Sequence, residues 1–574
     1  MSTPQRRVQR AEGPPDPLPA QDANEPAPAT SPAEEERSGY EYLRPLGRWF
    51  RWYDLPYVIL NRLHYSKAAS RLPVRWQEAL RRSESFLEQT HYAKEFRRQK
   101  GHRDWWRIHL PDDEKIALPA VWVVEYFTAS GVHRLYDSIR RAGWSAPQLS
   151  RDHAGEEVLA SSRAGGGQVG WRIAHLHSGE STGFSALTTH RATLPPGVTA
   201  ANIYGVPIGK GLTAVVVSFW LDESHSDRLN DVLHADHQAA LIRRPGHLAV
   251  AQGPSAVLHH RMQRERTRTH QSMRKWMTGA LPGTFARSGK PQPLFDLVFF
   301  DVADPLADGF IPARRENDAV RGIGVDAMTG YRTVSPDLPG LLFEPADSRS
   351  WAEDITANVW TLWGNSAVAA GLAIGSDKNV QGAAHSVGAD TTDFMARTGL
   401  TALLRLLREN ASVAHDNARK LHGGTSSRNL KRLRERTLTT SLDLATLEED
   451  IKEYNGRGWR FNEPQFYMER APSLRQREIE SGTQHSPPID LNKNERKTQK
   501  KLARELVAFD TDYREVLNTV ASIGASLDSR RVQRVAVWIS IASLGVALAT
   551  LWATSPTARD LILMASDAIS SWFS

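Results

Sequence analysis

The sequence contains no cysteine among its 574 residues. This absence excludes disulfide bonds, thiolate zinc sites, iron–sulfur clusters and cysteine nucleophiles. The sequence also lacks the HExxH and GxSxG motifs, and no pair of carboxylates stands out. We therefore assign no catalytic, metal-binding or cofactor-binding residue and expect no cofactor. The sequence favours a protein that binds over one that catalyses.

Two segments resemble functional motifs without fulfilling them. The stretch GVPIGKG at 205–211 is one residue shorter than a phosphate-binding loop, and Gly211 replaces the hydroxyl residue that would hold Mg²⁺. We predict a β-turn there. His234 and His237 could bind a metal together with Asp231 or Asp236. Two histidines three residues apart are also common on exposed helices, which is the interpretation we favour.

Positive charge is in modest excess, with a net charge of +7 and a pI near 9.4. The densest run of cations lies in HHRMQRERTRTHQSMRKWM, which is predicted to be helical. Such a helix could contact anions or lipid headgroups, or could simply expose a solvated face. The candidate contacts are Arg261, Arg264, Arg266, Arg268, Arg274 and Lys275. Nucleic acid is not expected as a partner.

A run of 20 residues without charge begins at Val535 and reads VAVWISIASLGVALATLWAT. A helix of about 20 apolar residues is long enough to cross a bilayer, so the run predicts a transmembrane helix at 535–554. Arg530, Arg531 and Arg534 precede it, which predicts a cytoplasmic N-terminal body. The expected location is the cell membrane, with a single pass and the lipid bilayer as partner.

A regular apolar seam lies immediately upstream, with spacings that alternate between four and three residues. Such spacing is typical of a coiled coil or of one helix in a bundle. It predicts a stalk helix that could also mediate self-association. The seam consists of Leu502, Leu506, Phe509, Tyr513, Val516, Val520, Ile523 and Leu527.

Composition divides the rest of the chain. Short β-like runs between glycine and proline turns, such as IALPAVWVVEYF, GWRIAHLH, GLTAVVVSFWL and PLFDLVFFDV, predict a mixed α+β domain. The predicted segments are a disordered stretch at 1–39, a helical segment rich in aromatics and arginine at 40–110, the α+β domain at 111–350, a helical region at 351–492, the stalk at 493–534, the transmembrane helix at 535–554 and an interfacial tail at 555–574. The fold class is thus α+β, followed by a helical bundle and stalk and one C-terminal transmembrane helix.

This architecture resembles that of CorA-type magnesium channels, in which a cytoplasmic α+β domain and a long stalk helix lead into the membrane. The resemblance is topological, because the chain has one apolar span and no Gly-Met-Asn tripeptide after it. The stretches AVWVVEYF, WMTGALPGTF and RRVQRVAVWISIASLGVALA also resemble uncharacterised bacterial single-span membrane proteins. This second resemblance implies a bacterial membrane protein but no activity.

The sequence therefore predicts a membrane-anchored cytoplasmic protein that binds or senses an unknown ligand. One alternative is a CorA-like transporter of divalent cations. A second alternative is a membrane-tethered enzyme that acts on a phosphate-bearing substrate, which the basic helix would attract.

Overall fold

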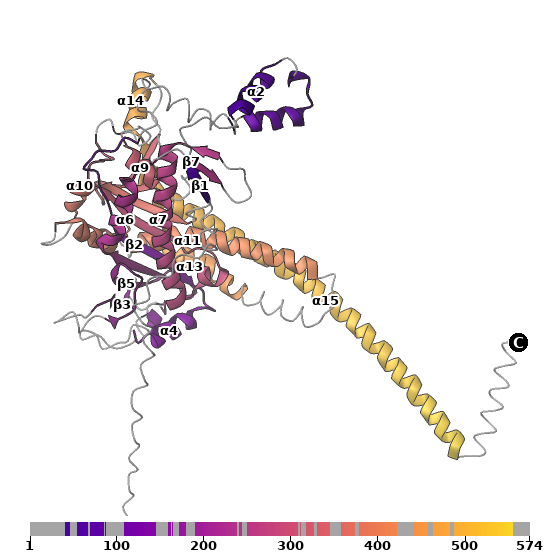
Figure 1. Ribbon diagram of the computed structural model, residues 1–574. Helices are drawn as coiled ribbons and strands as arrows, with labels where there is room; N and C mark the ends of the chain where they lie inside the picture. Colours follow the sequence, from indigo (N-terminus) through magenta and orange to yellow (C-terminus); the bar gives the residue numbers. More distant parts are fainter. Residues whose placement is uncertain are drawn as a thin grey trace, which may run out of the picture.

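The structure is a computed structural model in which an 11-stranded mixed sheet organises the body (Figure 1). It describes residues 41–45, 54–66, 69–84, 87, 108–144, 159–161, 163–164, 171–179, 190–237, 240–243, 250–307, 310, 317–325, 330–344, 358–372, 378–421, 441–456, 463–482 and 487–554. The stretch at 1–39 and the tail at 555–574, for which disorder and an interfacial position are predicted, lie outside these residues.

The strands of the large sheet follow the order β14-β13-β10-β11-β12-β9-β2-β6-β5-β3-β4. All neighbours are antiparallel except the pairs β12–β9 and β3–β4. The strand bounds are β2 Ile116–Phe127, β3 Trp171–His177, β4 His190–Arg191, β5 Val198–Pro207, β6 Thr213–Leu221, β9 Leu294–Phe300, β10 Tyr331–Val334, β11 Leu341–Glu344, β12 Val359–Asn365, β13 Tyr467–Arg470 and β14 Ile489–Asp490. The four β-like runs of the sequence become β2, β3, β6 and β9.

A second, three-stranded sheet has the order β1-β7-β8. It is formed by β1 Glu41–Pro45, β7 Ala240–Arg243 and β8 Val250–Gln252. Helix α2 (Asp54–His64) and the short 3-10 helix η2 (Ala69–Arg71) belong to an N-terminal unit that Figure 1 shows beside the body.

Helices cover both faces of the large sheet, which gives a three-layer arrangement (Figure 1). One face carries α4 (Val132–Arg141), α6 (Glu223–Leu233), α7 (Pro254–Ala280) and α9 (Asp318–Ile323). The opposite face carries α8 (Thr284–Ser288), α10 (Ser366–Ala370), α11 (Val380–Leu421), α13 (Leu447–Gly456) and the first part of α15 (Leu491–Thr554). Helix α14 (Pro472–Glu480) lies between β13 and β14 in the chain.

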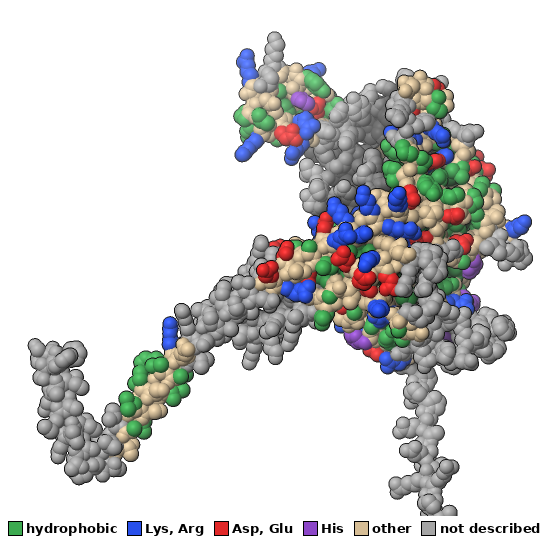
Figure 2. All heavy atoms as spheres, turned by 180° about the vertical axis from the view of Figure 1, so that it is seen from behind, with side chains coloured by type: hydrophobic (Ala, Val, Ile, Leu, Met, Phe, Trp, Pro, Cys, Tyr) green, Lys and Arg blue, Asp and Glu red, His purple; other side chains and the backbone are tan. Residues whose placement is uncertain are grey.

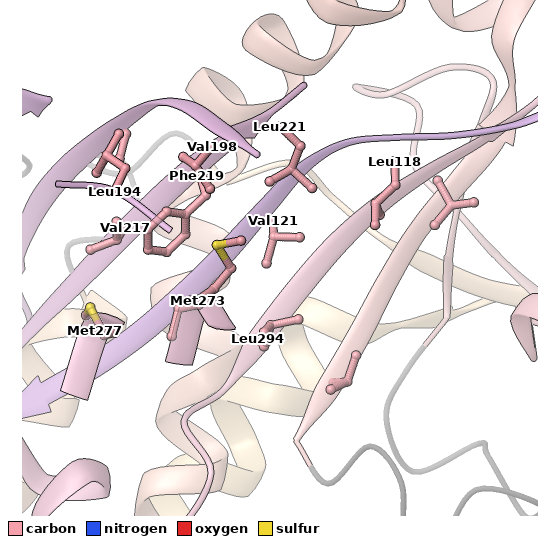
Figure 3. Close-up of a cluster of buried hydrophobic side chains, with 14 of the residues drawn as sticks. Leu118, Val121, Leu194, Val198, Val217, Phe219, Leu221, Met273, Met277 and Leu294 are labelled. Atoms are coloured by element: carbon pink, nitrogen blue, oxygen red, sulfur yellow. The ribbon is translucent and has the colours of Figure 1, made fainter. Parts of the chain in front are cut away.

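The central strands are buried on both faces, because each face has its own apolar core. Strand β2 shows the alternation, since Val121 and Val123 point into the core beneath α6 and α7 while Trp122 and Val124 point toward α11. Figure 3 shows part of the first core, where Met273 and Met277 of α7 lie near Val217 and Phe219 of β6. Uninterrupted apolar runs in the sequence reflect this burial on two sides.

The sheet crosses the boundary that composition places at residue 350. Strands β12, β13 and β14 belong to the predicted helical region at 351–492, yet they pair in one sheet with β9, β10 and β11. The α+β domain and the helical region are therefore joined in one fold. Strands β13 and β14 are short, and their sequence gives little sign of their pairing.

The predicted transmembrane helix at 535–554 is wrong. Among the residues that the structure describes, no helix has the length and apolarity needed to span a bilayer. The run instead forms the distal end of α15, a continuous helix of 64 residues whose first half is rich in charge. The prediction rests on the lack of charge over 20 residues, a property that the end of a long helix can have without crossing a bilayer. The predicted single-pass location in the cell membrane depends on this helix and is therefore also wrong.

Candidate functional site

Strands β3 and β5 present a row of polar side chains on the face of the sheet that α11 partly covers. His175 of β3 lies opposite Asn202 of β5, which in turn lies opposite Ser218 of β6. On its other side Ser218 lies opposite Trp122 of β2, which belongs to the core beneath α11. Cross-strand neighbours share a face, so this row continues the α11 side outward to the edge of the sheet. A register irregularity between Arg172 and Ala174 brings Arg172 to the same side.

These strands and α11 bring together six side chains that we call the histidine face. Arg172 and His385 are exposed and the other four are half-buried. The histidine face consists of Arg172, His175 and His177 on β3, Asn202 and Tyr204 on β5, and His385 on α11.

His175 is held by a short hydrogen bond between its Nδ1 and Oδ1 of Asn202, at 2.5 Å. An amide oxygen can only accept, so Nδ1 carries the proton and Nε2 is left as an acceptor. Burial lowers the pKa of His175, and the nearby Arg172 and His177 lower it further, against the opposing effect of Asn202. The ring is therefore neutral near pH 7.

Arg172 supplies the positive charge of the histidine face. Among the described residues no ion pair is recorded for it, and Tyr204 lies opposite it in the register. Burial raises the pKa of Tyr204, although the Arg172 charge opposes this shift, so the phenol stays protonated and can donate a hydrogen bond. A second exposed arginine, Arg191 of β4, lies opposite His177.

Helix α11 closes one side of the histidine face with His385. The His385 ring lies over Trp220, with 3.9 Å between ring centroids, and Trp220 meets Trp122 edge to face at 6.1 Å. Partial burial lowers the pKa of His385, and His175 lowers it further. The buried indole Nε1 groups of Trp122 and Trp220 have no hydrogen-bond partner among the described residues. The polar groups around this end of α11 therefore include more hydrogen-bond donors than acceptors.

The arrangement can bind a small polar anion. Arg172 provides charge, Tyr204 and the Asn202 amide provide donors, and neutral His175 provides an acceptor that becomes a donor once protonated. Within the described ranges, no three His, Asp or Glu side chains are grouped closely enough to hold a metal ion.

The structure separates the six cations of the predicted basic helix, which is α7. Arg266 is fully buried and paired with Asp296, and Arg274 donates to the backbone oxygens of Gln292 and Asn358. Burial lowers the pKa of Arg274 to about 9. The other four, on the side of α7 away from the sheet, are Arg261, Arg264, Arg268 and Lys275.

The seam of α15 is rotated slightly from the predicted one. Leu506 and Tyr513 are buried, Leu502 is half-buried and Phe509 is 37% exposed. The buried stripe also includes Gln499, Ala503 and Asp510, which extend it toward polar positions. Arg534 is exposed. The side chains of Val516, Val520, Ile523, Leu527, Arg530 and Arg531 lie outside those that the structure describes.

The segment 205–211 runs from the end of β5 into the hairpin turn that leads to β6, so the predicted turn forms in its second half. The Gly211 N–H donates to Oδ2 of Asp450 at 3.0 Å, so a carboxylate of α13 occupies the side where a phosphate loop would hold phosphate. Nε2 of His234 pairs with the Glu114 carbonyl, and Nε2 of His237 pairs with the Val232 carbonyl. These backbone contacts account for both histidines without a metal.

Sequence reasoning missed the histidine face because its residues span positions 172 to 385. One signal was present, namely the alternation of Arg172, His175 and His177 in WRIAHLH, since polar residues there interrupt an otherwise apolar strand. Asn202 and Tyr204 repeat the pattern in the next paired strand. Comparisons of the chain with protein-family models, with curated proteins and with solved structures found no match to any of them.

Proposed function

We propose that the protein binds or senses a small anion at the histidine face and that α11 transmits the binding to α15. The observation that carries this proposal is the position of His385. It lies on Trp220 within electrostatic range of His175, and it belongs to the helix that packs along α15. A ligand at the histidine face would therefore contact the helix that supports the projecting part of the molecule.

A buried polar network couples α11 to α15 three turns beyond His385. Nε of Arg397 donates to Glu463 at 2.7 Å, and Glu463 also accepts from Arg496 of α15 at 3.0 Å. Gln499 of α15 donates to the Arg397 carbonyl at 2.8 Å. Such a network has directional contacts, so a rotation of α11 would change the contacts of α15.

The ligand class follows from the charges of the site. Arg172 favours a carboxylate or phosphate group, while the His385 and Trp220 rings, tilted by 40° to each other, form a wall of limited size. The neutral imidazole of His175 would gain a proton beside a bound anion and so donate a second charge-assisted hydrogen bond. A small organic anion fits this set better than an apolar ligand.

The test is calorimetric titration of the full chain with inorganic phosphate and with succinate at pH 7. Arg172→Gln is expected to weaken binding by tenfold or more. Arg268→Gln is the matched control, since it removes one exposed arginine from α7 on the opposite face of the sheet. Equal losses in the two variants would contradict the proposal and favour the basic helix. A preference between the two anions would identify the ligand chemistry.

Transmission is tested separately by hydrogen exchange with and without phosphate. The proposal expects slower exchange of α11 amides at 380–400 and of α15 amides near Gln499. Protection restricted to β3 and β5 would leave binding in place but would contradict transmission through α11.

A further inference from the structure

The distal part of α15 exposes large apolar side chains on a helix that stands clear of the body. Figure 1 shows this part of α15 away from every other labelled element, and Figure 2 shows its apolar surface. Seven such side chains are each between 54% and 70% exposed. They are Val535, Val537, Trp538, Ile539, Ile541, Leu544 and Val546. Soluble chains seldom expose a continuous apolar surface of this size, which indicates that another surface covers it.

Six of these seven apolar side chains lie on two opposite faces of the helix, and Trp538 lies between the faces. At 100° per residue, Val535, Ile539 and Val546 share one face, and Val537, Ile541 and Leu544 share the other. A single neighbouring helix covers only one of these faces. Covering both requires at least two neighbours, so a pair of helices does not suffice.

The polar groups of the segment fit such a bundle. The Ser540 and Thr550 hydroxyls donate to the carbonyls of Ala536 and Val546 in their own helix. They therefore need no hydrogen-bond acceptor from a neighbouring helix. Gln533 and the exposed Arg534 precede the apolar stretch. Parallel helices keep these polar side chains together at one rim, whereas antiparallel helices would set Arg534 beside the apolar end of a neighbour.

We infer that three or more copies of this chain pack in parallel through residues 535–546 of α15. The seven side chains offer each copy an area on the order of the ~800 Å² that one partner of a standard interface buries. The bodies then lie at the same end of the assembly, where α11 supports each α15. This assembly is independent of what the histidine face binds.

The first test is the mass of the full chain by light scattering and sedimentation in buffer without detergent. At least three times 64.0 kDa is expected. Ile539→Glu with Ile541→Glu places one carboxylate on each face and should reduce the mass to that of one chain, because unpaired carboxylates would enter both apolar contacts. Ala508→Glu with Thr511→Glu is the control, since it adds the same two charges at exposed positions of α15 about thirty residues earlier. A monomeric or dimeric parent chain would overturn the inference.

The second test uses the absence of cysteine, so that each introduced thiol is unique. Single cysteines at Val537, Ile541, Ser543 and Leu544 are oxidised and the cross-linked fraction is measured. Parallel copies should cross-link at Val537, Ile541 and Leu544 alike and less at Ser543, whereas antiparallel copies would cross-link at one central position. If a monomeric chain instead partitions into phosphatidylcholine vesicles, lipid rather than further copies covers the segment and the inference fails.

Discussion

Arg266 and Asp296 form an ion pair in the core, where Nη2 of Arg266 lies 2.6 Å from Oδ2 of Asp296 and both side chains are inaccessible to solvent. Arg266 comes from α7 and Asp296 from β9, so the pair fastens the helix to the centre of the sheet. Further donors and acceptors complete the shell, since Arg266 also donates to the Ile323 carbonyl and the Thr361 hydroxyl. A guanidinium that sequence reasoning assigned to an anion-binding surface is thus structural.

Asp296→Asn is expected to lower the free energy of unfolding by about 3–5 kcal/mol, because it leaves Arg266 charged and without its anion in the core. Urea denaturation measures this change. Arg268→Gln breaks an exposed pair with Glu265 and should cost less than about 1 kcal/mol. Similar losses of unfolding free energy in the two variants would show that the buried pair contributes no more to stability than the exposed pair. If Asp296→Asn does not fold, combining it with Arg266→Met should restore folding.

His270 predicts a loss of stability in acid. Its Nε2 lies 3.0 Å from Oδ2 of Asp296, and burial lowers its pKa to about 4 against the opposing effect of the Asp296 charge. The unfolded chain, with a histidine pKa near 6.5, binds this proton more readily. Stability contributed by neutral His270 is therefore complete above about pH 6.5 and is lost as the pH falls toward 4, by up to about 3 kcal/mol.

Unfolding in urea at pH 7 and pH 5 measures this dependence. The variant His270→Gln lacks the titrating group and should show a smaller difference between the two pH values, although its stability at pH 7 will be lower. An unchanged difference would mean that other groups carry the acid sensitivity.

The central strands could be predicted because burial on both faces requires uninterrupted runs of apolar residues, which are easy to recognise in the sequence. The run IALPAVWVVEYF becomes β2 over the same residues, 116–127, and α4 forms within VHRLYDSIRRAGW. The partners of polar residues could not be predicted, because they come from distant segments. Arg266 meets Asp296 thirty residues later, and the fold alone brings His175 within electrostatic range of His385.

The apolar run at the C-terminal end of α15 shows a second limit of prediction from sequence. Its composition predicts a membrane span, and the seam upstream predicts that one helix continues into it, but neither pattern shows what covers the apolar side chains. The histidine face has a related limit, since its sequence signal, the alternation of polar residues on β3, does not show which distant residues join it. Only the register of β3 against β5 brings Arg172, His175 and Asn202 together.

Gly211→Ala is expected to destabilise the fold by about 1–3 kcal/mol, as overpacking does in a filled site. A Cβ at this position would collide with the Thr446 hydroxyl and would lie 2.7 Å from Oδ2 of Asp450. Gly279→Ala in α7 is the control, because a Cβ there meets nothing within 4 Å and alanine favours helix by roughly 0.5–1 kcal/mol. Thermal unfolding should move in opposite directions for the two variants. A neutral Gly211→Ala would show that the hairpin can shift away from α13.

Binding at the histidine face should strengthen as the pH falls from 8 to 6. The pKa values of His175 and His385 lie below their usual value in the free protein, so both rings are neutral at pH 8. A bound anion stabilises the charged imidazole and raises these pKa values, so that binding takes up protons. Each proton taken up increases affinity by at most about tenfold per pH unit.

Sulfate is the suitable probe for this dependence because it stays dianionic throughout the range, whereas phosphate itself titrates. Calorimetric titration at pH 6, 7 and 8 gives the slope, and repeating it in buffers of different ionisation enthalpy counts the protons directly. His175→Gln keeps a hydrogen-bonding side chain beside Asn202 but cannot take up a proton, so it should bind sulfate with a shallower slope while Arg172 still contributes its charge. Affinity independent of pH in the parent chain would place the anion away from the imidazoles, and an equal slope in His175→Gln would assign the proton to another histidine.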